Sequence, residues 1–429
     1  MHNRTAKANL TADQQLAPTA DGIRLAAERL IDVVTHTPYL RNHNLSRQHE
    51  ANIWLKREDM QVVRSFKVRG AYNKIISLNE SERARGIVCA SAGNHSQGVA
   101  YACALLKIKG TIFMPAPTPA QKIAQTKRYG QGYVDLVLAG DSFDDAYQRA
   151  IKYQKQHGAV LVHPFDDRAV IEGQGTVGLE ITESAEHPID YLLVPIGGGG
   201  LAAGVCTWFK QHSPNTKIIG VEPAGAAAMH ASIAAGSKIT LEKIDNFVDG
   251  AAVKCVGDIT YAICKEHLDR IICVPEGKIC SSILKLYNEE AIVIEPAGAL
   301  SIAALDYMHD EIRDKNVACI ISGGNNDITR TGEIKERSLL FEGRKHYFVV
   351  NFPQRAGALR EFLHKVLGPE DDIVHFEYSK KNYREQGPAV IGIEVPDPCE
   401  LDALIARMQA HHVQFEYLNN NPALFQYLI

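Results

Sequence analysis

The chain has 429 residues, 45% of them hydrophobic and 22% charged, which is long enough for roughly two to three domains with a large core. A net charge of −4 without any block of like charges excludes the basic surface of a nucleic-acid or anionic-membrane binder, and favours small neutral or zwitterionic partners. The nine cysteines are scattered without CxxC pairs or cysteine–histidine clusters, which argues against a disulfide framework and a structural zinc site.

Residues 1–20 form a polar tail. No apolar run follows the basic residues of this segment, so we expect neither a secretory signal nor a membrane anchor. The expected location is cytoplasmic.

From about Ile23 to Asp327, short β-rich apolar runs alternate with helical patterns. The strand–helix pairs are GIVCAS with SQGVAYACALLK, GTIFMP with AQKIAQTKRYG, YVDLVLAG with SFDDAYQRAIKYQ, and DYLLVPI with LAAGVCTWFKQ. Such alternation predicts parallel strands joined by crossover helices, an α/β architecture. The uncharged run Leu192–Phe209 reaches the length of a membrane span, but its four central glycines favour a buried strand, loop and helix.

Lys67 lies between Phe66 and Val68 in the stretch SFKVRG. Most lysines are solvated, and a lone lysine is usually a surface group. Apolar neighbours, however, disfavour the ammonium form and lower the pKa of a lysine from its ordinary value of about 10.4. The neutral amine that results is a nucleophile able to form a Schiff base.

Three unusual loops follow predicted strands, at the sheet edge where ligands of α/β proteins gather. SAGNHSQG (Ser91–Gly98) opens a helix whose backbone amides suit a carboxylate, although Asn94 or Ser96 could equally serve as a simple cap. GGGGL (Gly197–Leu201) lets successive amides approach a phosphate, whereas a plain turn needs fewer glycines. SGGNND (Ser322–Asp327) places a hydroxyl and an amide side chain at a third strand end.

The character of the sequence changes after these loops. The segment TRTGEIKERSLLFEGRK is polar and charged, and we interpret residues 331–345 as a linker. Within residues 346–429 we expect the strand YFVVNF, the helix GALREFLHKVL, the strands DIVHFEYS and AVIGIEV, the helix ELDALIARMQ, and FQYLI as a candidate last strand. This β-α-β-β-α-β order predicts a small α+β, ferredoxin-like domain.

An activated amine, a phosphate cradle and a carboxylate-binding helix start are the parts that a pyridoxal phosphate enzyme acting on an amino acid needs. Jointly, the motifs resemble those of the threonine dehydratases, which share the tryptophan synthase β-subunit fold. SFKVRG resembles the cofactor-lysine motif of this family, SAGNHSQG its S-x-G-N-H loop, GGGGL its phosphate loop and SGGN its pyridine-nitrogen loop. The resemblance implies pyridoxal 5'-phosphate as cofactor and residues 21–330 as a catalytic domain of two open α/β lobes.

Carried over to this sequence, the resemblance implies that Lys67 binds the cofactor covalently and moves the substrate Cα proton, while Phe66 packs beside the ring. Ser322 would face the pyridine nitrogen, and Asn94 would hydrogen-bond the cofactor's 3-hydroxyl. The implied phosphate ligands are the backbone amides of Gly197, Gly198, Gly199, Gly200 and Leu201. The implied ligands of the substrate carboxylate are Ser91, Gly93, Asn94 and His95.

The implied reaction is dehydration and deamination of L-threonine to 2-oxobutanoate and ammonia, the first step of isoleucine biosynthesis, with L-serine as a second substrate. Serine racemases resemble this pattern but carry serine at the position of Ala92, so poor racemisation is expected because alanine cannot transfer a proton. Glu222-Pro223 is followed by AGAAAM without a second carboxylate, so we expect no divalent metal. The family suggests a homotetramer.

From about Tyr347, the chain resembles the ACT-like regulatory domain of biosynthetic threonine dehydratases, including the stretch FPQRAGAL. The resemblance implies feedback inhibition by isoleucine, with valine opposing it. The chain has room for one copy of this domain where some relatives have two. A purely structural or oligomerisation role is the alternative, because a fold alone does not establish a binding function.

Two functions of other classes are kept as alternatives. A nicotinamide-dependent oxidoreductase would use Gly198, Gly200 and Gly204 as its dinucleotide loop and Glu222, about 20 residues on, as its ribose-binding acid. That reading leaves Lys67 and the other two loops without a role. A catalytically silent amino-acid sensor on the same scaffold would be expected to lack the lysine, which is present.

Overall fold

The structure, a computed structural model, describes residues 17–378 and 385–420. The chain divides into two compact units. The N-terminal unit consists of Met1–Glu276 with Glu289–Asp327, and the C-terminal unit of Gly277–Asn288 with Ile328–Ile429.

The N-terminal unit contains two sheets, in which β1 pairs antiparallel with β2 and the remaining strand pairs are parallel. The larger sheet has the order β1-β2-β10-β7-β8-β9, with β1 Tyr39–Arg41, β2 Asn52–Arg57, β7 Tyr191–Pro195, β8 Lys217–Pro223, β9 Arg270–Val274 and β10 Asn316–Ile321. The smaller sheet has the order β5-β4-β3-β6, with β3 Ile87–Ala90, β4 Gly110–Met114, β5 Val134–Leu138 and β6 Val160–Leu161. The predicted α/β class with two lobes is confirmed.

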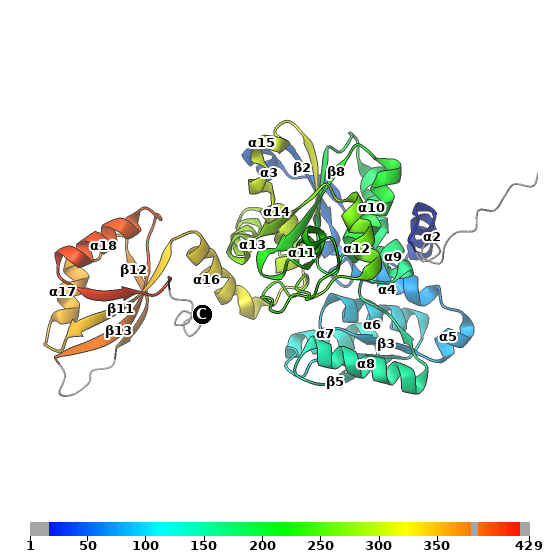
Figure 1. Ribbon diagram of the computed structural model, residues 1–429, viewed down its shortest axis with the longest axis horizontal. Helices are drawn as coiled ribbons and strands as arrows, with labels where there is room; N and C mark the ends of the chain where they lie inside the picture. Colours follow the sequence, from blue (N-terminus) through cyan, green and yellow to red (C-terminus); the bar gives the residue numbers. More distant parts are fainter. Residues whose placement is uncertain (1–16, 379–384, 421–429) are drawn as a thin grey trace, which may run out of the picture. The chain divides into compact units, whose positions relative to one another are not determined.

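Helices connect these strands, and α10 and α14 lie on opposite sides of the larger sheet (Figure 1). The helices before the smaller sheet and around it are α2 Ala20–Leu30, α3 His43–Gln48, α4 Lys67–Ile76, α5 Glu80–Ala84, α6 Asn94–Leu106, α7 Ala120–Gly130 and α8 Phe143–His157. Those that follow are α9 Arg168–Ser184, α10 Gly200–His212, α11 Ala228–Ala235, α12 Asp258–His267, α13 Glu276–Glu290, α14 Pro296–Ala303 and α15 His309–Ile312, and of these α13 belongs mostly to the C-terminal unit. Short 3-10 turns are η1 Glu58–Met60, η2 Ala224–Ala226, η3 Leu305–Tyr307 and η4 Ile328–Arg330.

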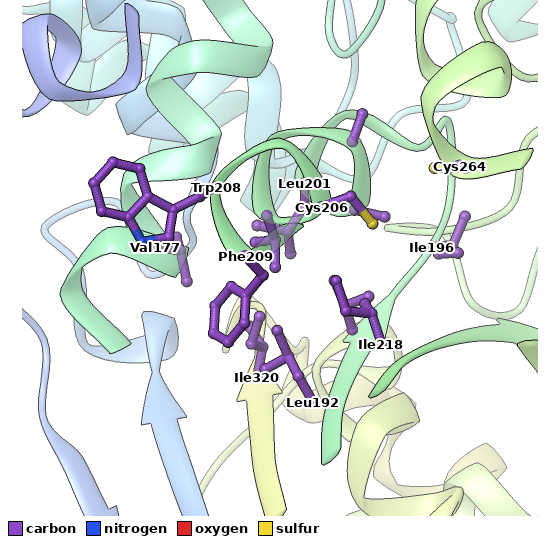
Figure 2. Close-up of a cluster of buried hydrophobic side chains, with 14 of the residues drawn as sticks. Val177, Leu192, Ile196, Leu201, Cys206, Trp208, Phe209, Ile218, Cys264 and Ile320 are labelled. Carbon is purple, nitrogen blue, oxygen red and sulfur yellow. The ribbon is translucent and has the colours of Figure 1, made fainter. Parts of the chain in front are cut away.

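One large apolar cluster packs α10 against the strands of the larger sheet. Figure 2 shows Phe209 of α10 beside Leu192 of β7 and Ile320 of β10, while Leu201, also on α10, lies nearer the start of the helix. All of these side chains are almost completely removed from water. Since β3, β4 and β7 are buried along their whole length, each reads as a continuous apolar run, as parallel strands covered on both faces do. This core fixes the position at which β7 ends and α10 begins.

The C-terminal unit has an antiparallel sheet in the order β12-β13-β11-β14. Its elements are β11 Lys345–Pro353, α17 Ala358–Lys365, β12 Asp372–Tyr378, β13 Gln386–Glu394, α18 Glu400–Ala410 and β14 Gln414–Tyr417. The predicted order of strands and helices is therefore confirmed up to α18. The last strand, β14, is formed by QFEY, which the sequence analysis did not single out, and FQYLI lies outside the described residues.

The segment 331–345 was expected to be a linker, but it contains the helix α16, Thr331–Phe341. Polar composition concealed its buried positions Ile334, Ser338 and Leu339. Residues 277–288 belong to the C-terminal unit, where the hydroxyls of Ser281 and Ser338 lie 2.9 Å apart and join this segment to α16. Among the residues that the structure describes, no helix combines the length and apolar character needed to cross a membrane.

Candidate cofactor and substrate site

The segments that carry the sequence motifs meet at the carboxyl ends of the parallel strands in the N-terminal unit. The backbone N–H of Phe66 donates to the carbonyl oxygen of Ser322 at 3.2 Å. Ser65 and Gly323 form an isolated antiparallel bridge next to it. The SFKVRG segment and the SGGNND loop, about 250 residues apart in sequence, are thus paired directly.

Lys67 is the first residue of α4 and is half-buried. Its ammonium donates a hydrogen bond to the carbonyl oxygen of Pro164 at 2.9 Å and lies 5.2 Å from the centre of the Phe66 ring. Removal from water lowers the pKa of Lys67 to about 8, although the nearby carboxyl of Glu295 acts in the opposite direction. About a tenth of this amine is therefore neutral at pH 7, far more than for an ordinary lysine, and the neutral form is the nucleophile.

The glycine loop joins β7 to α10, and Gly199 stands at the N-cap of the helix with φ +92°. A Cβ at Gly197 would come within 2.9 Å of the Ala251 Cα, and one at Gly198 within 2.2 Å of the Phe165 ring. The hydroxyl of Thr260 donates to the carbonyl oxygen of Gly198 at 2.7 Å and holds the loop in this shape. Backbone amides at the start of a helix are suited to bind a phosphate.

Asn94 and His95 occupy the first turn of α6, which follows β3. The histidine is buried, and its Nε2 lies 2.9 Å from the carbonyl oxygen of Val162. Desolvation and the charge of Lys67 lower the pKa of His95 to about 3, so its ring is neutral. A Cβ at Gly93 would meet no atom within 4 Å, which leaves space in front of the helix start for a ligand.

The residues present fit pyridoxal phosphate, which combines an aldehyde, a phosphate and a polar ring. The amine of Lys67 matches the aldehyde, and the amides of the Gly197–Gly200 loop match the phosphate. Two buried polar atoms nearby, Ser65 Oγ and His95 Nδ1, have no hydrogen-bond partner among the described residues. Such atoms in a native interior point to a missing ligand or water.

Glu295, which the sequence analysis did not identify, links two of the predicted loops. Its Oε1 accepts a hydrogen bond from Asn94 Nδ2 at 2.6 Å, and Asn94 Oδ1 in turn accepts one from Asn325 Nδ2 at 2.7 Å. The carboxyl is 4% exposed. Burial and the charge of Asp249 raise the pKa of Glu295 to about 7. In the sequence, Glu295 is marked only by the proline that follows it at the start of α14. Its position beside Asn94 results from the tertiary fold.

Glu295→Gln is expected to change how stability depends on pH. Because the folded state favours the neutral carboxyl, the contribution of Glu295 to the free energy of unfolding falls as pH rises from about 4.5 to about 7. Over that interval, the variant should gain about 3 kcal/mol relative to wild type. Denaturant titrations at pH 4.5 and pH 8 measure this difference. Glu28→Gln, which changes an exposed carboxyl on α2, should instead parallel wild type.

Glu222, the acid that a nicotinamide site would need, is engaged within the fold. Its two carboxylate oxygens accept hydrogen bonds from the backbone N–H groups of Met229 at 2.8 Å and His230 at 2.7 Å. It is 0% exposed, and burial raises the pKa of Glu222 to about 7. The buried carboxyl therefore serves the fold and is not presented to a ribose hydroxyl, which removes the main support for an oxidoreductase. The described residues contain no group of three or more His, Cys, Asp and Glu side chains that could hold a metal.

The chain is similar to known proteins in both sequence and fold. Residues 30–323 match the family "Pyridoxal-phosphate dependent enzyme", and residues 336–428 match "C-terminal regulatory domain of Threonine dehydratase". Proteins named "L-threonine dehydratase biosynthetic IlvA" are 54% identical, one from Halalkalibacterium halodurans over 95% of this chain and 99% of its own length, and one from Bacillus subtilis over 94% and 96%.

Two solved structures are similar to the chain as well. The processed form of threonine deaminase isoform 2 from Solanum lycopersicum gives a TM-score of 0.70 at 38% identity, and covers 79% of this chain and 99% of that chain. Maize serine racemase gives a TM-score of 0.70 at 32% identity, and covers 75% and 98%. The predicted cofactor and the predicted family are confirmed. The chain therefore belongs to the pyridoxal-phosphate dependent enzymes, and within them to the biosynthetic threonine dehydratases, which are lyases.

Proposed function

We propose that the protein dehydrates and deaminates L-threonine to 2-oxobutanoate and ammonia, the first step of isoleucine biosynthesis, and that L-serine is a second substrate. The 54% identity to biosynthetic threonine dehydratases over 95% of the chain carries this proposal. An assay of 2-oxo acid release tests it. Threonine and serine should each yield the corresponding 2-oxo acid, and the absence of product from threonine would refute the proposal.

The proposed roles of the residues follow from their positions. Bound pyridoxal phosphate supplies an electron sink for the negative charge that develops at the substrate Cα. Lys67 holds the cofactor and moves the Cα proton, because its amine has a lowered pKa and lies at the meeting point of the loops. The amides at the start of α10 bind the phosphate, and Ser91, Gly93, Asn94 and His95 at the start of α6 bind the substrate carboxylate.

Two neutral residues favour elimination over competing reactions. Ser322 is assigned to face the pyridine nitrogen, and a hydroxyl does not hold that nitrogen protonated as a carboxylate would. Ser322 would therefore leave the ring a weaker electron sink, which would disfavour transamination and favour loss of the β-hydroxyl. Ala92 cannot deliver a proton to the opposite face of the substrate, so racemisation is expected to be slow. The amides at the start of α10 would hold the phosphate of the cofactor, which would supply an acid for the leaving hydroxyl.

We also propose that isoleucine inhibits the enzyme through the C-terminal unit and that valine opposes this inhibition. The match of residues 336–428 to a regulatory domain supports the proposal. In the FPQRAGAL loop, both polar atoms of the Gln354 amide are buried and have no partner among the described residues, which points to a missing ligand or water. A homotetramer in the cytoplasm remains the expectation for the assembly.

Isoleucine is expected to raise the threonine concentration at half saturation by about fivefold or more, the usual range of an allosteric coupling. Threonine saturation curves with and without isoleucine measure the shift. A chain that lacks residues 348–429 should keep its activity and lose the shift. Identical curves for the intact protein with and without isoleucine would leave the C-terminal unit with a structural role.

A further inference from the structure

A buried group of charged side chains surrounds Arg69, two residues after Lys67 in the first turn of α4. The guanidinium of Arg69 donates to both oxygens of Glu58, from Nε and from Nη2, at 2.8 Å each. It also donates to both oxygens of Glu180, at 2.6 Å from Nη1 and 2.8 Å from Nη2, and Nη1 reaches Thr176 Oγ1 at 3.1 Å. Arg69 is thus clamped between carboxylates from two elements, η1 and α9.

Lys56 on β2 balances the charge of this group. Its ammonium donates to Glu180 Oε2 at 2.5 Å and to the carbonyl oxygen of Thr37 at 2.7 Å. The hydroxyl of Thr37 donates to Glu58 Oε1 at 2.5 Å. Two cations therefore face two carboxylates in an interior without exposed charge. The set Thr37, Lys56, Glu58, Arg69, Thr176 and Glu180 is called the Arg69 network below.

Stability alone does not account for the Arg69 network. The desolvation of buried charges offsets much of their mutual attraction, and buried ion pairs can often be replaced by apolar side chains without loss of stability. A planar guanidinium with several hydrogen bonds fixes the orientation of its side chain as well as its distance from its partners, which an apolar contact does not. The network is therefore best explained by the geometry that it imposes on α4.

The geometry in question is the rotation of α4 about its axis and its distance from α9. The two helices touch backbone to backbone, since a Cβ at Gly173 would lie 2.5 Å from the carbonyl oxygen of Arg69 and one at Gly70 would lie 2.8 Å from that of Val170. Residues two apart in a helix point about 200° apart around its axis. Fixing Arg69 on one side therefore directs Lys67 to the other side.

We propose that the Arg69 network is the positioning device for the cofactor lysine: by clamping Arg69 to Glu58 and Glu180, it holds the ε-amine of Lys67 in its place beside the Pro164 carbonyl. This rests on the proposed function, in which Lys67 carries the cofactor. Arg69 acts through Lys67, so it is a positioning residue. A change at Arg69 should therefore alter kcat and the surroundings of the bound cofactor while the binding of threonine is largely kept.

The test is Arg69→Lys in the full-length, cofactor-loaded enzyme. Lysine keeps the positive charge but lacks the planar set of N–H donors of the guanidinium, so it cannot hold the carboxylates of both Glu58 and Glu180 in place. Per bound cofactor, kcat should fall by about ten- to a hundredfold, which is the effect of a misplacement of about 1 Å, with KM for threonine within about threefold of wild type. The visible circular dichroism band of the lysine-bound cofactor should change as well. A merely structural role would move neither this band nor kcat per bound cofactor.

Two further variants keep the test decisive. Thr176→Val removes one hydrogen bond of Arg69 and leaves both carboxylate clamps, so it should shift kcat and the dichroism in the same direction by a smaller factor, even if Arg69→Lys fails to fold. Arg407→Lys makes the same replacement at the Arg407–Asp371 ion pair of the C-terminal unit, and should leave both readouts at wild-type values.

Borohydride reduction and mass spectrometry separate the two levels of the proposal. A wild-type adduct on Lys67 together with wild-type kcat and dichroism in Arg69→Lys and Thr176→Val overturns the positioning role alone. A wild-type adduct on any other residue overturns the proposed function of Lys67, and the positioning role with it.

Discussion

Lys67→Ala is expected to abolish the release of 2-oxobutanoate from threonine, with a loss in kcat of about a thousandfold or more. Two separate contributions disappear with the amine. A methyl group cannot bond the cofactor aldehyde, and it cannot accept the Cα proton, a step to which a positioned base alone contributes about 10²–10⁴-fold. Both contributions require the neutral amine, and the lowered pKa of Lys67 makes this form available near neutral pH. Product formation at saturating threonine and cofactor measures the loss.

Lys74→Ala is the matched control for this variant. Lys74 lies on the same helix, α4, and its ammonium forms an ion pair with Asp167 at 2.6 Å, apart from the meeting point of the loops. Its removal should leave kcat within about twofold of wild type, since partly exposed ion pairs contribute little. Wild-type turnover in Lys67→Ala would contradict the assignment. A retained reducible adduct in that variant would contradict it independently.

The sequence was sufficient to predict the parts of the molecule that depend on local pattern. The apolar run DYLLVPI forms β7, since a parallel strand that is covered on both faces is apolar along its length and does not alternate with polar residues. The glycine loop that follows it leads into α10, as predicted. The loops after β7 and β10 were brought together because the carboxyl ends of neighbouring parallel strands share one edge. The pairing of Phe66 with Ser322 follows from that topology.

Features that depend on long-range contacts could not be predicted in this way. Glu295 lies about 200 residues from Asn94, and Glu180 about 110 residues from Arg69, so no local spacing connects either pair. The buried face of α16 was hidden by its charged composition, since only a few of its positions meet other side chains. The strand β14 is short and partly exposed, and it is defined by pairing with β11 more than by its own residues.

Gly199→Val is expected to weaken cofactor binding by about a hundredfold or more, a loss of roughly 2.7 kcal/mol in binding free energy. Gly199 has φ +92°, a left-handed conformation in which a β-branched residue is strained. A Cβ would also lie 2.8 Å from Met229 Cε and 2.9 Å from Thr260 Cβ. Met229 is flexible, but Thr260 holds the carbonyl of Gly198 through its hydroxyl. Movement of Thr260 would release the same loop whose amides are proposed to bind the phosphate.

Gly132→Val separates backbone strain from damage to the phosphate site. Gly132 has φ +82°, and a Cβ there would meet no atom within 4 Å, so this variant carries similar strain far from the glycine loop. Titration of each apoprotein with pyridoxal phosphate, followed by visible absorbance, gives the dissociation constants. Gly132→Val should bind as wild type and lose only stability, whereas Gly199→Val should lose affinity. Equal affinities in the two variants would show that the loop does not hold the phosphate, because the collision with Thr260 would then have no consequence for the ligand.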